Sequence, residues 1–161
     1  MRRLTISAHA CTETLRLLIA IAWADGRLDD KEKAGVRGAA EVLNLSQDFR
    51  TKLDEALKKS LPFDQILLEG LSARDQAFAY VAAVWMSGVD DDVDDKEKAL
   101  LDRLAKELGF STEHRAELDA IAKDLPRAAG GKWGDEIVSL FKAIPPRLEK
   151  VQPGDIEVTF E

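Results

Sequence analysis

Cysteine and histidine, the side chains that most often build catalytic and soft-metal sites, are scarce in this chain. The only cysteine is Cys11, and the two histidines are His9 and His114. One cysteine excludes an intramolecular disulfide and cannot form a structural zinc site alone. His9 and Cys11 are close in sequence, but we expect them on a mobile terminus, which makes a poor site. Two histidines assemble no convincing Ser/His/Asp or Cys/His set, so we expect no enzyme.

Long hydrophobic runs are also missing. The apolar stretch near the start is interrupted by Glu13 and Arg16, and its uninterrupted part, 17–24, is far shorter than the roughly 18–20 residues that cross a bilayer. No credible cleavage region follows it. We therefore expect a soluble, cytoplasmic chain without direct membrane insertion.

Basic residues are outnumbered by acidic ones. Lysine and arginine total 23 and aspartate and glutamate total 30, which gives a net charge of −7. An acidic chain is a poor match for nucleic acid or an anionic membrane surface, so we expect protein partners. A length of 161 residues fits one domain, 1–161.

Two segments are apolar on nearly all sides, which is typical of helices inside a bundle. The first runs from Thr12 or Thr14 to Asp25-Gly26, and the second opens at Ala73. Each is followed by an acidic turn and by amphipathic helical patterns, of which one is capped by Ser46 and another by Ser111.

The predicted fold is therefore all-α, a helical bundle. It has two pseudo-repeated helical hairpins with acidic turns, at about 12–60 and 73–126, joined by a short helix around 63–71. A C-terminal helix, 134–144, should end at Pro145-Pro146, and a tail completes the region 133–161.

The terminal sequence DIEVTFE alternates apolar and polar residues with the period of a strand, but the sequence shows no evident partner strand. Two interpretations stay open. The tail is loosely held, or it is an edge strand that pairs with a second chain and so favours a homodimer.

The two acidic turns are related by an internal repeat. A shift of 65 residues aligns Asp25 with Asp90, and the run 30–34 (DKEKA) with 95–99 (DKEKA). An alternative alignment places a three-residue insertion before Asp94 and instead pairs Trp23 with Trp85.

The acidic turns are candidate sites for a hard divalent cation, because Ca²⁺ and Mg²⁺ prefer clustered carboxylate oxygens. The candidate metal ligands are Asp25, Asp29, Glu32, Asp90, Asp92, Asp94 and Glu97. Helix capping explains part of the pattern without a metal, since Asp29 with Glu32 and Asp94 with Glu97 have the form of capping boxes. Capping leaves Asp25, Asp90 and Asp92 unexplained.

The run from Ala22 to Glu32, AWADGRLDDKE, resembles the signature of the TerB-like family, which is named for a tellurite-resistance protein. In that signature an apolar helix ends in Ala-x-Ala-Asp-Gly and a glutamate follows six residues later. The second turn departs from it, with Ser87-Gly88-Val89-Asp90-Asp91 in the same place. The resemblance implies an all-α domain whose acidic residues bind a divalent cation and which acts in stress-response assemblies rather than as an enzyme.

Two hypotheses follow for the function. The first is a non-enzymatic, TerB-like stress-response module of the tellurite-resistance type that binds Ca²⁺ or Mg²⁺ at one or both turns. The second is a protein-interaction scaffold without metal, in which the acidic residues cap helices. A metal-dependent hydrolase ranks below both, because the sequence shows no nucleophile or general base for it.

Overall fold

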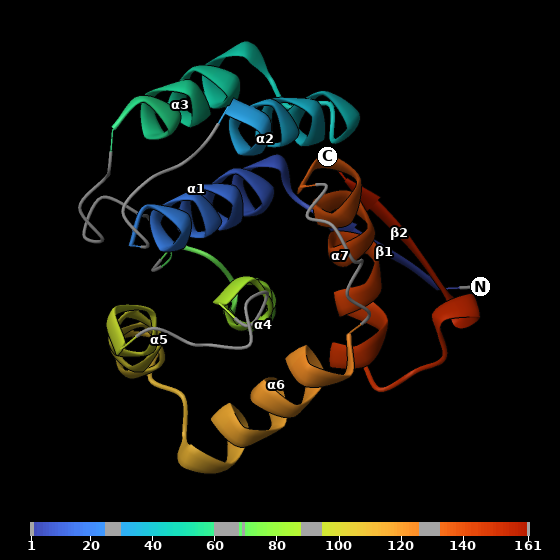
Figure 1. Cartoon of the computed structure of the whole chain (residues 1–161). Coiled ribbons are helices and arrows are strands. Elements are labelled where there is room, and N and C mark those ends of the chain that lie inside the picture. The colour runs from blue at the N-terminus through green and yellow to red at the C-terminus, as the bar shows by residue number, and fades with distance from the viewer. Residues whose placement is uncertain are drawn as a thin grey trace.

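A computed structural model of the chain describes residues 2–24, 30–59, 68, 70–87, 95–125 and 133–160. Most of them are helical, which confirms the predicted all-α class (Figure 1). The helices are α1 (Ala8–Ala24), α2 (Asp30–Val42), α3 (Gln47–Lys58), α4 (Ala73–Ser87), α5 (Asp95–Glu107), α6 (Thr112–Asp124) and α7 (Trp133–Leu148). The other described elements are the strands β1 (Arg2–Ile6) and β2 (Ile156–Phe160) and the 3-10 turn η2 (Pro153–Asp155).

Helices α1 and α4 pack against each other at the centre of the bundle (Figure 1). α2 and α3 lie on one side of this pair, and α5 and α6 lie on the other. α3 contacts α1, and α6 contacts α4 in the same way. α7 closes a third side, where it packs against α2 and α4. The two segments predicted to be apolar on nearly all sides are therefore the central helices.

The core is built mainly from the side chains of α1 and α4. Leu15 and Leu18 on α1 and Phe78 on α4 are fully buried. Phe78 also meets Phe141 of α7 edge to face, with 5.0 Å between ring centroids. Because burial of one such side chain contributes roughly 1.5–3 kcal/mol, this core is the main source of stability.

Helix α1 begins at Ala8, earlier than the predicted start at Thr12 or Thr14. The hydroxyl of Ser7 explains the earlier start, because Ser7 Oγ accepts a hydrogen bond from the Ala10 backbone N–H at 3.1 Å. β1 precedes this cap, and Cys11 is fully buried. The expectation of a mobile start to the chain is therefore wrong.

Helix α7 continues through Pro145 and Pro146 to Leu148, so the prediction that these prolines end regular structure is wrong. Both prolines are buried and both lie in the last turns of the helix. Each proline lacks the N–H that would bond the carbonyl four residues earlier, but the N–H groups of Glu149 and Val151 bond to the carbonyls of Pro145 and Pro146 at 3.0 Å each and close the helix. Burial of the two rings offsets the missing N–H groups.

The terminal strand has its partner within the chain, so the expectation of a loosely held tail is wrong. β2 pairs with β1 in parallel, with Arg2 opposite Ile156 and Ile6 opposite Phe160. One face of this two-stranded sheet packs on the core through buried side chains that include Leu4 and Ile6. The partner strand lies at the other end of the sequence, where no short-range pattern can indicate it.

The turns after α2 and α5 share one backbone geometry. Asn44 and Gly109 have the left-handed φ values of 57° and 73° that close a helix. The helix starts also match, since α1, α2 and α3 begin at 8, 30 and 47 and α4, α5 and α6 begin at 73, 95 and 112. These bounds follow the 65-residue shift seen in the sequence. A common origin of the two halves stays a prediction.

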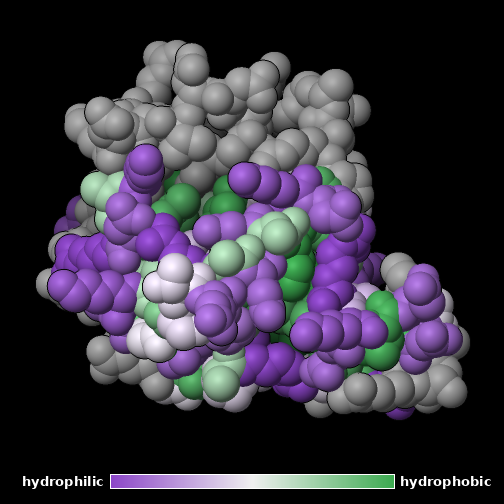
Figure 2. Space-filling view, turned by 90° about the horizontal axis from the view of Figure 1, so that it is seen from below, coloured by the Kyte–Doolittle hydropathy of each residue, from purple (hydrophilic) through white to green (hydrophobic). Residues whose placement is uncertain are grey.

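The short helix expected at 63–71 lies mostly outside the described residues. Among the helices that the structure describes, none is both long and apolar enough to cross a membrane. The face seen in Figure 2 is largely hydrophilic over the residues that are coloured, with hydrophobic atoms visible in smaller areas between the polar side chains.

Candidate functional site

The side chains predicted as metal ligands lie outside the described part of the structure. They are those of Asp25, Asp29, Glu32, Asp90, Asp92, Asp94 and Glu97. The described helix ends do bound the two turns, because α1 ends at Ala24 and α2 begins at Asp30, while α4 ends at Ser87 and α5 begins at Asp95. The capping boxes and the metal site therefore both stay predictions.

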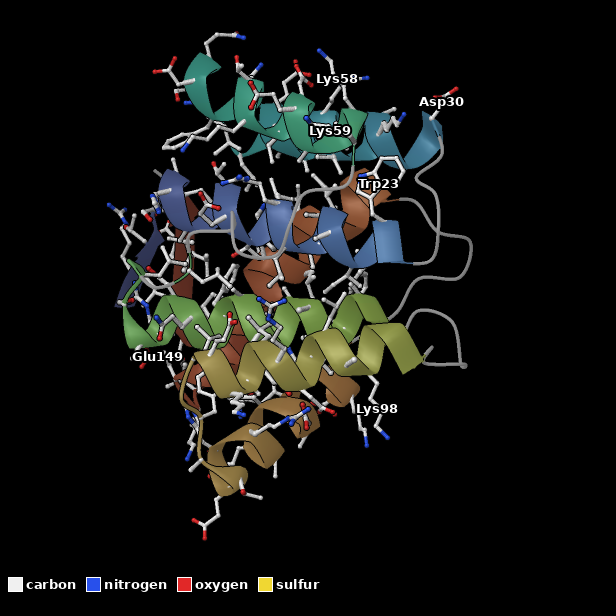
Figure 3. The ribbon with its side chains drawn as sticks, turned by 90° about the vertical axis from the view of Figure 1, so that its left-hand side faces the viewer. Trp23, Asp30, Lys58, Lys59, Lys98 and Glu149 are labelled. Atoms are coloured by element: carbon white, nitrogen blue, oxygen red, sulfur yellow. The ribbon has the colours of Figure 1, made fainter. Side chains whose placement is uncertain are left out.

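The helix ends that bound the two turns lie at the same end of the molecule. Trp23, Asp30 and Lys98 mark this end in Figure 3. The indole Nε1 of Trp23 donates a hydrogen bond to the carbonyl of Ala56 at 3.0 Å, which holds the end of α1 against α3. Elsewhere in the described residues, no three His, Cys, Asp or Glu side chains are grouped so that they could hold a metal ion.

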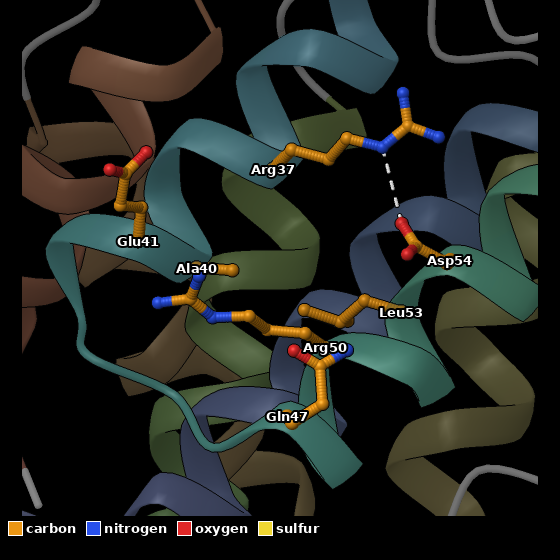
Figure 4. Close-up of a pocket in the computed structure, with 7 residues that line it drawn as sticks. All are labelled: Arg37, Ala40, Glu41, Gln47, Arg50, Leu53 and Asp54. Atoms are coloured by element: carbon orange, nitrogen blue, oxygen red, sulfur yellow. Dashed lines mark hydrogen bonds and ion pairs between the residues drawn. The ribbon is translucent and has the colours of Figure 1, made fainter.

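A groove between α2 and α3 is lined entirely by described residues (Figure 4). Its volume is about 290 Å³, and it is lined by Arg37, Ala40, Glu41, Gln47, Arg50, Leu53 and Asp54. The floor is apolar, because Ala40 and Leu53 are buried, and the rim is polar.

The two arginines of the groove are bonded differently. Arg37 donates from Nε to Asp54 Oδ1 at 3.1 Å, in a pair with both side chains about half exposed. Arg50 is partly buried, and its Nε donates to the carbonyl of Leu45 at 2.9 Å. Neither terminal nitrogen of Arg50 has a hydrogen-bond or ion-pair partner among the described residues. The groove thus contains a guanidinium with free donors above an apolar floor.

The second half of the chain has a closed polar network at the interface of α4, α5 and α6. The hydroxyl of Tyr80 donates to Asp119 Oδ1 at 2.7 Å and accepts from Nε of Arg115 at 2.9 Å. Arg115 also donates from Nη2 to Asp102. Both Nε and Nη2 of Arg115 therefore have a hydrogen-bond acceptor within the network.

The environment of this network shifts two pKa values. Burial, and then the hydrogen bond to the Asp119 carboxylate, raise the pKa of Tyr80 to about 12. The hydrogen bond from Arg115 to Asp102 raises the pKa of Arg115 further above its ordinary value. Tyr80 is therefore neutral and Arg115 charged at any physiological pH.

The groove and the network occupy corresponding positions under the 65-residue shift. Arg50 corresponds to Arg115, and each is the residue whose backbone N–H bonds to the helix-capping serine carbonyl, Ser46 or Ser111. The remaining pairs are Asp54 with Asp119, Arg37 with Asp102, and Leu15 with Tyr80. This site was not predicted from the sequence, although the shared arginine and aspartate are visible in the repeat.

A buried ion pair lies inside α1. Nη1 of Arg16 donates to both carboxylate oxygens of Glu13 at 2.9 Å, and the Glu13 side chain is only 1% exposed. Nearby, burial and then the negative charge of Asp75 raise the pKa of the Cys11 thiol to about 12. The thiol is protonated at neutral pH, so it offers no thiolate to a metal or a substrate.

The fold and the groove define a helical bundle with a polar surface groove, a class that fixes no activity by itself. Residues 6–122, more than half of the chain, match the family model described as "Protein of unknown function (DUF533)", and the chain belongs to this family. No match was found among curated proteins or among solved structures.

Proposed function

We propose that the chain is a non-enzymatic, TerB-like helical module that binds a divalent cation, Ca²⁺ or Mg²⁺, at its acidic turns. The observation that supports this proposal is the position of the described helix ends, which bound two acidic turns at one end of the molecule. A cation bound at a turn would fix the two flanking helices relative to each other.

The acids that precede the helix starts favour a cation over capping alone. A helix N-terminus is stabilised by negative charge in its first turn, and one capping side chain per helix is sufficient for this. Asp25, Asp90 and Asp92 lie before the predicted caps and have no role in capping. Ca²⁺ and Mg²⁺ bind through several clustered oxygen ligands, and these additional carboxylates would provide them.

The family assignment supports the TerB-like part of the proposal. The DUF533 family is grouped in the TerB-like superfamily, and the run from Ala22 to Glu32 resembles the TerB-like signature. We extend this to a role in a cytoplasmic stress-response assembly of the tellurite-resistance type, with protein partners rather than nucleic acid or a membrane.

A protein-interaction scaffold without metal is the second candidate. The groove between α2 and α3 favours it, because a partly buried arginine with free donors is a common anchor of protein interfaces. In this case the acids at the turns would serve only as caps and as solvating charge.

Thermal unfolding with and without each cation tests the first candidate. A cation at one hundred times its dissociation constant should stabilise the fold by about 2.7 kcal/mol. Asp25→Asn should remove the part of this stabilisation that comes from the first turn, and Asp90→Asn the part that comes from the second. Neither residue is needed as a cap, so the fold itself should not be weakened.

The matched control is Glu55→Gln, which removes one exposed acid of α3 that belongs to neither turn. It should leave the cation-dependent gain unchanged. Absence of any shift with either ion would refute the cation site, and an equal response in all three variants would show that the ligands are other residues.

A further inference from the structure

We propose that the groove between α2 and α3 binds a single carboxylate side chain, a glutamate or aspartate of a protein partner, on the guanidinium of Arg50. The structure shows what this position binds when a carboxylate is within reach. In the second half the corresponding Arg115 donates to the carboxylate of Asp102. In the first half the position of Asp102 is taken by Arg37, so the carboxylate at that position is missing.

A second difference keeps the groove open. Tyr80 supplies a hydroxyl to both Asp119 and Arg115, whereas the corresponding Leu15 has no polar atom. Asp54, which corresponds to Asp119, pairs instead with Arg37. Among the described residues Arg50 has one side-chain hydrogen bond, from Nε to the carbonyl of Leu45, and its terminal nitrogens are available to a ligand.

The charges that line the groove select a singly charged anion. Arg37 and Arg50 are balanced by Glu41 and Asp54, so the lining is neutral before a ligand binds. A carboxylate leaves one excess negative charge there, and a doubly charged phosphate leaves two, in a chain whose net charge is already −7. A planar carboxylate also matches the paired N–H groups of a guanidinium.

The size and exposure of the groove indicate a side chain of a protein rather than a free small molecule. Its volume of about 290 Å³ lies at the lower limit of ligand pockets, and Arg37 and Asp54 on its rim are 58% and 44% exposed. Gln47 on the rim can bond to the backbone of a partner that covers the apolar floor formed by Ala40 and Leu53.

The test is a titration of the ¹⁵N-labelled 161-residue chain with a capped helical peptide that contains one glutamate, observed through the arginine Nε–Hε resonances. The resonance of Arg50 should shift to saturation, while that of Arg115 should not move because its guanidinium is already bonded. The same peptide with glutamine in place of glutamate should not bind. A chelator in the buffer makes the result independent of any cation at the turns.

Four variants sharpen the titration. Arg50→Gln should abolish binding, and Arg37→Asp should weaken it at least tenfold by supplying an internal carboxylate. Glu41→Gln should tighten binding several-fold by removing an acid that competes with the peptide for Arg50. Glu41→Gln and Arg37→Asp both keep Arg50 and its bond to Leu45, so they test the proposal even if Arg50→Gln fails to fold. Arg103→Gln removes an exposed arginine of α5 that does not line the groove; it is the matched control and should not change binding.

Three results would overturn the proposal. Equal shifts with the glutamate and glutamine peptides would show that the carboxylate is not recognised. Tighter binding of inorganic phosphate than of the peptide would assign the groove to small anions. Self-association that depends on Arg50 would make a second copy of this chain the occupant.

Discussion

The closed network around Arg115 and the open groove around Arg50 show how different side chains at two corresponding positions give one arginine a hydroxyl and a carboxylate partner and leave the other without them. In the second half, a tyrosine hydroxyl and the Asp102 carboxylate satisfy the arginine within the fold. In the first half, Leu15 and Arg37 occupy those positions and leave the arginine with free donors. The helix framework is the same, so the difference lies in the side chains.

The central helices α1 and α4 differ in the charge that they bury, and here it is the first half that contains the paired polar groups. α1 buries the ion pair Glu13–Arg16, while the residues 65 positions later in α4 are the apolar Phe78 and Val81. The first half is thus polar in its centre and open at its surface. The second half has apolar side chains at these two positions, although Asp75 of α4 is also buried, and its surface arginine is paired.

The largest expected effect comes from breaking the buried pair. Arg16→Met should lower the free energy of unfolding by about 3–5 kcal/mol, because Glu13 loses the charge that neutralises it in the core. The double variant Glu13→Leu/Arg16→Met, which makes α1 resemble α4, should regain most of this loss. Urea unfolding measures both. A double variant as unstable as the single one would mean that the pair is needed for more than mutual neutralisation.

Removing the tyrosine hydroxyl should have the next largest effect. Tyr80→Phe leaves Asp119 and Arg115 each without one hydrogen bond in a partly buried place, so we expect a loss of about 1–3 kcal/mol in urea unfolding. Asp54→Asn, which breaks the exposed pair of the first half, should cost less than about 1 kcal/mol. Equal losses would show that the two halves do not differ in how tightly they are closed.

A smaller effect should appear only at alkaline pH. The pKa of Tyr80 is raised from 10.0 to about 12, so its contribution to stability is complete below pH 10 and is lost as the pH rises towards 12. The pKa of Cys11, raised from 9.0 to about 12, acts in the same direction from pH 9 upward. Unfolding free energies measured between pH 9 and 12 should therefore fall less steeply in Tyr80→Phe and in Cys11→Ala. Unchanged slopes in both variants would contradict the assignment.

The smallest effects should come from the two helix ends. Gly109→Ala should cost about 1 kcal/mol in thermal unfolding, since its φ of 73° disfavours a side chain while the surrounding space is open. Asn44 already tolerates φ 57°, so Asn44→Gly should change stability by less than about 0.5 kcal/mol. A large gain from Asn44→Gly would indicate strain in the first half that the second half lacks.

The sequence predicted those parts of the fold that depend on local chemistry. Apolar runs on all sides identified α1 and α4, and Ser46 and Ser111 identified the starts of α3 and α6. Each of these signals lies within a few residues of the structure that it determines, which is why it can be recognised without the fold.

What the sequence did not reveal depends on contacts between distant residues. The early start of α1 rests on Ser7 and a preceding strand, and that strand has its partner at the other end of the chain. The groove at Arg50 is open because Leu15 and Arg37, on other helices, do not provide the hydroxyl and the carboxylate that pair with Arg115 in the second half. An arginine with free donors cannot be told from a paired one until its neighbours are placed.

The parallel pairing of Arg2 with Ile156 also orders events in time. A chain made from its N-terminus can form helical hairpins as they emerge, because their contacts are local. β1 is made before the helices and β2 after them, so β1 must wait for its partner, and the entropy of closing so long a loop is recovered only once the helices have brought the two strands together. β1 is therefore secured later than the helices that follow it in the sequence.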